Sequence, residues 1–245
     1  MITLFIMKYI PNFITSLNLV SGFVAIIFAA NGDLLTASWL IFAAMVFDFL
    51  DGFSARLLKA YSTLGKELDS LADVVSFGVA PAFIIYCLLN DSLVLLAPAI
   101  ADSSSLIFTL ILILPAIMPV CGAFRLAIFN LDSSQSTTFK GMPIPANALA
   151  VISVVIAGHY SHSEILNAFS GSPVLLIILT IVLSYLMVSR MPMLSLKISN
   201  FKFKGNEGRY ILAGLVLIDF AVFGVSGVPL IIPLYLISSG LALLF

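Results

Sequence analysis

Four aspartates stand close together in an otherwise apolar chain, and they are the residues best suited to chemistry. Asp48 and Asp51 are three residues apart, and Asp69 and Asp73 are four apart, so on helices each pair would share a face. An acid within or beside a membrane segment costs free energy and marks a functional site by default. Carboxylate oxygens without His or Cys suit Mg²⁺ or Mn²⁺, and four of these groups could hold two ions. The pattern therefore predicts a divalent-metal site.

Small and basic residues accompany these acids. Gly52 and Ala55 follow the first pair and Gly65 precedes the second, so a ligand or a neighbouring helix could approach the backbone there. Arg56 could grip a phosphate through two hydrogen bonds. Residues 57–64 would form a short surface connection that turns the two acidic pairs toward each other. Two other interpretations stay open, namely a cation or proton pathway, and acids simply paired with nearby Arg and Lys side chains.

The rest of the chain places these residues in a membrane. Of its 245 residues, 61% are hydrophobic and 9% are charged, with a mean hydropathy of +1.18, whereas a soluble domain carries about 25% charged residues. Long apolar runs containing Gly and Pro favour helices over a barrel. We expect a single all-α domain over residues 1–245, a polytopic membrane helix bundle. About eight spanning helices are predicted, at 12–30, 34–50, 70–89, 106–128, 144–160, 173–190, 210–226 and 228–244, the last two forming a hairpin.

The basic residues predict the orientation. If the N-terminus is cytoplasmic, all eleven Lys and Arg fall at cytoplasmic helix ends or loops. The opposite side then receives Asp33, Asp91, Asp102 and Glu164 and no basic residue. This partition follows the positive-inside rule. It predicts that the aspartate cluster lies at the cytoplasmic face, within reach of a water-soluble substrate.

The aspartate pattern also resembles a family signature. The residues read D-x-x-D-G-x-x-A-R, then eight residues, then G-x-x-x-D-x-x-x-D, which is similar to the signature of the CDP-alcohol phosphotransferase family at every fixed position. Members are integral membrane enzymes, usually homodimers, in which an acceptor hydroxyl displaces CMP from a CDP-linked lipid or alcohol with divalent metal. The resemblance implies that all four aspartates are metal ligands and that Asp73 is also the general base. It implies binding of the CDP-linked lipid by Gly52, Ala55, Arg56 and Gly65, and Asn18 of the first helix is a further candidate for the same role.

Four further segments resemble one branch of this family, the membrane-bound phosphatidylserine synthases. They are PNFITSLNLVSG at 11–22, SFGVAPA at 76–82, FRLAIFN at 124–130 and FKGMPIPA at 139–146, with Ile128 in place of the usual second basic residue. The branch implies CDP-diacylglycerol and L-serine as substrates, phosphatidylserine and CMP as products, the plasma (inner) membrane as the location and no nucleic-acid partner. A sibling enzyme that uses glycerol 3-phosphate or inositol stays open, as does a cation or proton-coupled transporter.

Four polar residues outside the signature have two interpretations each. Arg125 could bind the serine carboxylate or a lipid phosphate, or only lie at the membrane interface, and Lys140 could join the same pocket or only mark topology. Asn18 could touch the nucleotide or bond another helix. Asp219 falls in the middle of the seventh segment, where it needs a partner or a water-filled pocket.

Overall fold

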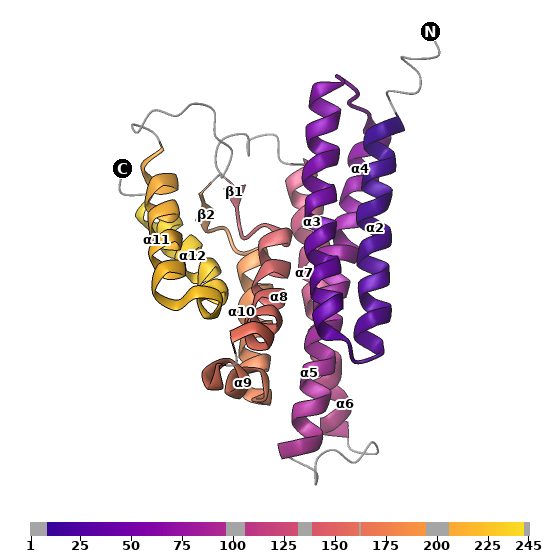
Figure 1. Cartoon of the computed structure of the whole chain (residues 1–245). Coiled ribbons are helices and arrows are strands. Elements are labelled where there is room, and N and C mark those ends of the chain that lie inside the picture. The colour runs from indigo at the N-terminus through magenta and orange to yellow at the C-terminus, as the bar shows by residue number, and fades with distance from the viewer. Residues whose placement is uncertain (1–8, 97–105, 132–138, 162, 195–205, 243–245) are drawn as a thin grey trace.

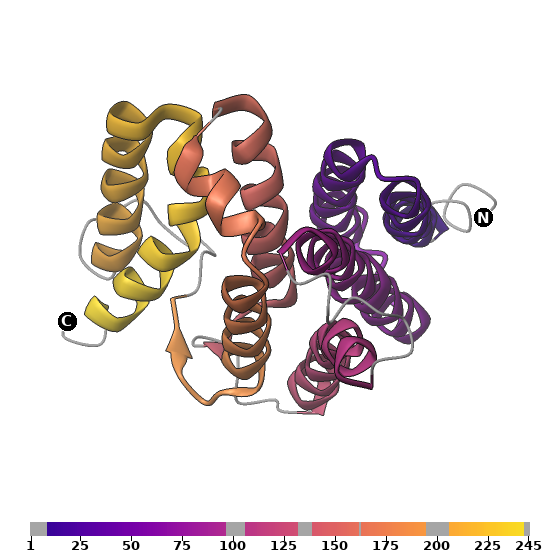
Figure 2. The ribbon, with the colours of Figure 1, turned by 90° about the horizontal axis from the view of Figure 1, so that it is seen from below.

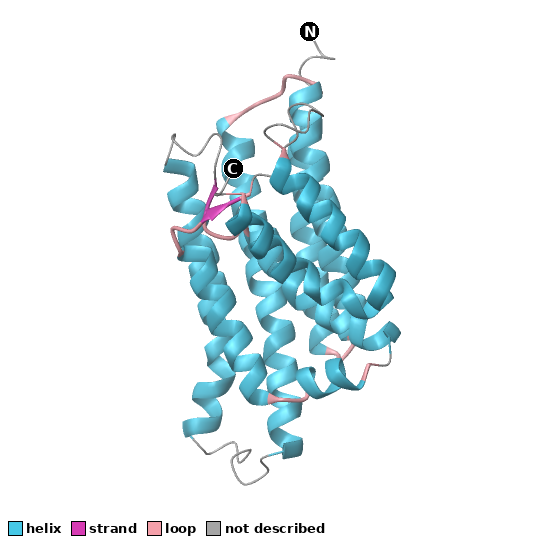
Figure 3. Ribbon diagram, turned by 90° about the vertical axis from the view of Figure 1, so that its left-hand side faces the viewer, coloured by secondary structure: helices cyan, strands magenta, loops and turns pink. Residues whose placement is uncertain are grey.

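The computed structural model describes residues 9–96, 106–131, 139–161, 163–194 and 206–242. Within these ranges the chain is a bundle of helices that run roughly side by side (Figure 1). The prediction of an all-α polytopic membrane bundle is confirmed. The strands in the described part are a two-residue antiparallel pair, β1 (Phe139–Lys140) with β2 (Pro192–Met193), near one end of the bundle (Figure 3).

The first three helices carry the aspartates. Helices α2 (Tyr9–Ala30) and α3 (Leu34–Leu57) form an antiparallel hairpin. The side chain of Asp33 caps α3 by accepting a hydrogen bond from the Thr36 amide at 2.9 Å. Hydrogen bonding to the Thr36 side chain and then to its amide lowers the pKa of Asp33. Helix α3 continues beyond the predicted end at residue 50, so the first half of the signature is helical. Helix α4 (Thr63–Asp73) carries the second half, and Ser62 caps its start.

Helix α4 does not end at the aspartates but continues through a π-helical turn. This turn, η1 (Val74–Val79), leads into α5 (Ala80–Leu96), so residues 63–96 form one helical stretch. A π-turn inside a helix often marks a functional site. Gly22 lets α2 approach this turn closely, since a Cβ at Gly22 would lie 2.6 Å from the Ser76 Cα.

The remaining helices complete the bundle. A second long stretch consists of α6 (Leu106–Ile113), η2 (Leu114–Ala116) and α7 (Ile117–Leu131). It is followed by α8 (Ile144–Ser161), α9 (Glu164–Ser170) and α10 (Pro173–Val188), with α9 and α10 meeting at 77°. Helices α11 (Glu207–Phe223) and α12 (Ile231–Leu241) are joined by η3 (Gly224–Leu230) and lie side by side in Figures 1 and 2, as the predicted C-terminal hairpin requires.

The number of membrane crossings depends on how two features are counted. Six described helical stretches are long and apolar enough to cross a bilayer, or seven if the bent pair α9 and α10 is one span. One of the six is residues 207–241, which folds back on itself at η3. Counting the bent pair as one span and that hairpin as two segments gives eight, the number predicted from the sequence, and the number of crossings stays a prediction.

The described basic residues gather at one end of the bundle. The start of α2, the end of α3, the start of α4, the second half of α7, β1, the end of α10 and the start of α11 all lie toward this end (Figure 1). These elements and the loops beside them carry Arg56, Lys59, Lys66, Arg125, Lys140, Arg190 and Arg209. Asp33, Asp91 and Glu164 belong to the other end, whereas Lys8, Lys197, Lys202, Lys204 and Asp102 lie outside the described residues. The separation of charge follows the prediction, and the assignment of the basic end to the cytoplasm stays a prediction.

Two other features concern the cysteines and Asp219. Cys87 and Cys121 are both free thiols. The carboxylate of Asp219 packs against Gly227 of η3, where an added Cβ would lie 2.6 Å from one carboxylate oxygen. Within the described part of the chain, Asp219 Oδ1 has no hydrogen-bond partner.

Candidate active site

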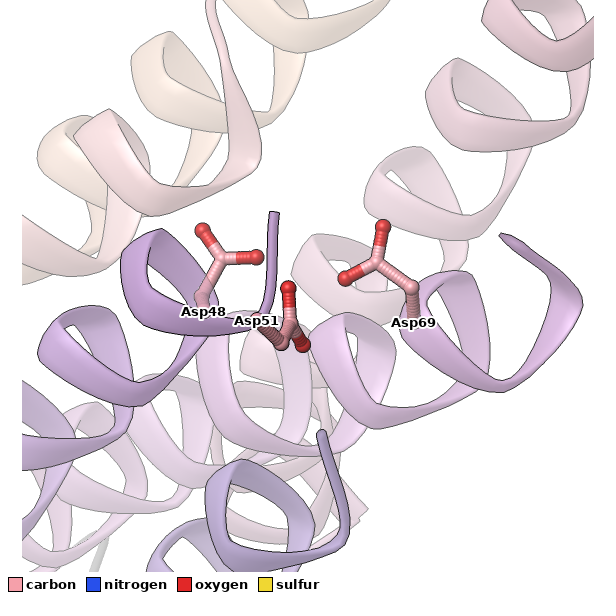
Figure 4. A group of neighbouring side chains, drawn as sticks. All are labelled: Asp48, Asp51 and Asp69. Atoms are coloured by element: carbon pink, nitrogen blue, oxygen red, sulfur yellow. The ribbon is translucent and has the colours of Figure 1, made fainter. Parts of the chain in front are cut away.

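Three aspartates converge at the basic end of the bundle. One carboxylate oxygen from each of Asp48, Asp51 and Asp69 lies within 4.8 Å of the others, with the first two on α3 and the third on α4 (Figure 4). Asp51 is buried and the other two are half-buried. Figure 4 shows the three side chains directed into a shared space between the two helices. The two halves of the signature therefore face each other.

Within the described part of the chain, the cluster contains no counter-ion. Among the described residues, none of the three carboxylates pairs with a Lys or Arg side chain, and the Lys66 ammonium instead donates a hydrogen bond to the Asn130 carbonyl at 3.2 Å. Asp69 Oδ1 is buried without a hydrogen-bond partner in the same part of the chain. The interpretation that these acids only pair with nearby basic residues is therefore wrong. Three converging carboxylate oxygens with an unsatisfied acceptor fit a hard divalent cation.

Asp73 lies next to this group but is held separately. It is only 7% exposed and accepts a hydrogen bond from Asn18 Nδ2 at 3.2 Å. The backbone carbonyl of Asn18 in turn accepts a hydrogen bond from Ser76 Oγ at 2.9 Å. Asp73 interacts electrostatically with the other three aspartates, although it is not one of the three that converge within 4.8 Å. Asn18 thus contacts Asp73, and it does not line the pocket that opens between α2, α3 and α4.

Thr15 supports the cluster and was missed by the sequence analysis. Its hydroxyl, on a side chain that is 2% exposed, donates a hydrogen bond to Asp51 Oδ2 at 2.6 Å. Thr15 and Asn18 are three residues apart in an apolar helix and therefore share one face of α2. That spacing of two polar residues was the signal that could have found Thr15.

A pocket of about 200 Å³ opens beside the cluster between α2, α3 and α4, with Asp51 and Asp69 in its wall. Gly52, Ala55 and Gly65 also line it, as the signature predicts for a bound ligand. A Cβ at Gly52 would meet nothing within 4 Å, so that position faces open space. Arg56 is exposed at the end of α3 and is not among the lining residues.

A second pocket, of about 320 Å³, carries positive charge. Arg125, Lys140 and Arg190 line it from α7, β1 and the segment after α10. Arg125 is only 9% exposed, lies over the Phe129 ring at 5.4 Å from its centroid and interacts electrostatically with Asp73. The fold thus gathers three basic residues that are far apart in the sequence, and one of them is linked electrostatically to the aspartate site.

Comparison with known proteins identifies the family. The profile of the CDP-alcohol phosphatidyltransferase family matches residues 8–186, which include every aspartate of the site. The chain belongs to this family.

Individual CDP-alcohol phosphatidyltransferase relatives extend the match. A Helicobacter pylori protein is 32% identical over 239 residues, covering 96% of this chain and 91% of the relative. A Bacillus subtilis protein is 37% identical over 184 residues, covering 75% of this chain and 89% of the relative. Both are named CDP-diacylglycerol–serine O-phosphatidyltransferase. A Methanothermobacter thermautotrophicus protein named archaetidylserine synthase is 36% identical over 154 residues, 62% of this chain and 60% of the relative.

Proposed function

We propose that this enzyme transfers the phosphatidyl group of CDP-diacylglycerol to the hydroxyl of L-serine, giving phosphatidylserine and CMP. The observation that carries the proposal is the convergence of Asp48, Asp51 and Asp69 within 4.8 Å, without a basic partner among the described residues, in a chain of this family. The names of the relatives support serine as the acceptor.

The aspartates are proposed to hold divalent metal, Mg²⁺ or Mn²⁺, as two ions. Asp48, Asp51 and Asp69 form the close group, and Asp73 lies near enough to share in the site. When bound, the metal supplies positive charge that neutralises the diphosphate and the departing CMP. The pocket beside the cluster takes the CDP part of the donor, with Gly52, Ala55 and Gly65 leaving room for it. Arg56 is assigned to a donor phosphate from its place in the signature.

Asp73 is the proposed general base, and Asn18 positions it. The Asp73 carboxylate takes the proton of the serine hydroxyl while the serine oxygen bonds to the phosphorus that carries diacylglycerol. The bond from that phosphorus to the CMP oxygen breaks, and CMP leaves with the bonding electrons. The hydrogen bond from Asn18 Nδ2 orients the carboxylate for this step. Asn18 therefore acts on the transfer reaction through Asp73.

The basic pocket is the proposed site for the acceptor. The serine carboxylate is negatively charged, and Arg125, Lys140 and Arg190 offer positive charge around one cavity. Inositol is neutral and would make little use of these charges, whereas glycerol 3-phosphate would use them as serine does. The pocket therefore argues against inositol and leaves glycerol 3-phosphate as the competing acceptor.

The charge pattern supports the proposed orientation, and the family resemblance supports the proposed dimer and membrane. The enzyme is proposed to act as a homodimer in the plasma (inner) membrane, with its site at the cytoplasmic face. Its apolar helices contact the bilayer, and the basic end carries the site. Serine then arrives from the cytosol and the lipid donor from the membrane.

CMP release by the purified protein tests the proposal. The protein is given CDP-diacylglycerol and Mn²⁺ or Mg²⁺, with serine, glycerol 3-phosphate and inositol in parallel reactions. We expect serine-dependent release that is lost in Asp73→Asn. Asp33→Asn is the matched control, because Asp33 caps α3 at the opposite end of the bundle. Release only with glycerol 3-phosphate would refute serine as the acceptor. Uptake of cations or protons into vesicles that contain the protein, without any CMP release, would favour a transporter.

A further inference from the structure

A large apolar cavity, separate from the two pockets described above, has Asp48 in its wall. It has a volume of about 590 Å³ and is bounded by α3, the start of α8 and the C-terminal hairpin. Its walls include Phe49, Leu149, Leu212 and Ile232, and Asp48 is the one charged group among the described residues that line it. Cavities of ~300–1,000 Å³ are typical of small-molecule sites. The lining therefore suits an apolar guest whose polar end lies at Asp48.

The hairpin wall of this cavity is tied to the rest of the fold. Tyr235 on α12 is 5% exposed, and its hydroxyl donates a hydrogen bond to the Leu194 carbonyl at 2.9 Å. The Leu194 amide donates a hydrogen bond to Ser239 Oγ at 3.1 Å. These two bonds fix α12 to the segment that follows β2. These hydrogen bonds hold the hairpin wall in place. Its helices lie outside the residues 8–186 that the family profile matches.

We propose that this cavity holds one acyl chain of the lipid donor and that the C-terminal hairpin selects which chains fit. The inference rests on the proposed function. Asp48 belongs both to the cavity lining and to the aspartate cluster, so a chain in the cavity leaves its headgroup at the reacting centre. The chain arrives from the bilayer already out of water, so the cavity favours the chains that pack best against its walls. Ile232, on the hairpin, narrows the space available to that chain.

Filling the cavity tests this assignment. Ile232 is 5% exposed, and Ile232→Trp would occupy part of the volume. We expect the ratio of kcat/KM for dioleoyl over dioctanoyl CDP-diacylglycerol to fall about tenfold relative to the wild type, equivalent to about 1.4 kcal/mol. Ile237→Trp is the matched control, since Ile237 lies on the same helix, is 54% exposed and does not line the cavity. It should leave the ratio unchanged.

A second variant tests the inference even if Ile232→Trp does not fold. Ile232→Ala enlarges the cavity without overpacking it, and with a mixture of CDP-diacylglycerols we expect its products to shift toward longer chains. An unchanged ratio in Ile232→Trp together with an unchanged product profile in Ile232→Ala would overturn the inference while leaving the proposed function intact. If Ile232→Trp does not fold, an unchanged profile in Ile232→Ala alone overturns it. Failure of the wild type to release CMP from either donor would instead refute the proposed function.

Discussion

Replacing Thr15 by Val should weaken metal binding without changing the fold. The Thr15 hydroxyl donates a 2.6 Å hydrogen bond to Asp51 Oδ2 in a buried position, and Val has nearly the same shape without the hydroxyl. A hydrogen bond to a charged group contributes about 1.5–3 kcal/mol. Every 1.4 kcal/mol corresponds to about a tenfold change in affinity. The hydroxyl should therefore be worth about 10- to 100-fold in metal affinity, the range seen when a group that orients a metal ligand is removed.

The assay is titration with Mn²⁺, read in two ways. The Mn²⁺ concentration for half-maximal CMP release should rise about 10- to 100-fold in Thr15→Val, while release at saturating Mn²⁺ recovers most of the wild-type rate. Electron paramagnetic resonance of free Mn²⁺ measures binding directly and does not depend on the proposed reaction. Thr15→Ser keeps the hydroxyl and should stay near the wild type. Equal Mn²⁺ binding by the Val variant and the wild type would refute the claim that Thr15 prepares Asp51 as a ligand.

Three further substitutions test other contacts. Gly22→Ala would place a Cβ 2.6 Å from the Ser76 Cα, so we expect a loss of about 1–3 kcal/mol in the free energy of unfolding, and a wild-type denaturation curve would contradict the close approach of α2 to η1. Arg190→Gln should raise the KM for serine about tenfold, the equivalent of about 1.4 kcal/mol, without changing the KM for the lipid donor. A parallel change in both constants would argue against a separate acceptor pocket. Gly227→Ala should lower the thermal unfolding midpoint through its clash with the Asp219 carboxylate, and adding Asp219→Ala should restore it.

The local features of the site could be predicted from the sequence because helical periodicity is a local property. The three- and four-residue spacings place each aspartate pair on one helix face, and the apolar runs establish that the helices lie in a membrane. The partition of Lys and Arg along the chain already predicts that the described basic residues gather at one end. The signature also predicts the small residues Gly52, Ala55 and Gly65 that line the pocket beside the cluster.

The contributions of distant helices could not be predicted in this way. The sequence left open whether Asn18 touches the nucleotide or bonds another helix. The structure shows its amide donating a hydrogen bond to Asp73, where α2 approaches η1 closely at Gly22, and its contact with the donor stays a prediction. The last hundred residues resemble generic membrane helix in sequence. Their hairpin nevertheless forms a wall of the apolar cavity at Asp48, because Tyr235 bonds to Leu194.

The sequence by itself determined that the chain is a helical membrane protein with four aspartates spaced for metal and an excess of positive charge at one end. Only the tertiary structure decided which three carboxylates converge, that Thr15 bonds Asp51 and Asn18 bonds Asp73, and that Arg125, Lys140 and Arg190 share one pocket. The physical reason is that spacing along one helix depends on backbone geometry that every residue shares. Contacts between helices depend instead on how particular side chains pack and hydrogen-bond across the bundle.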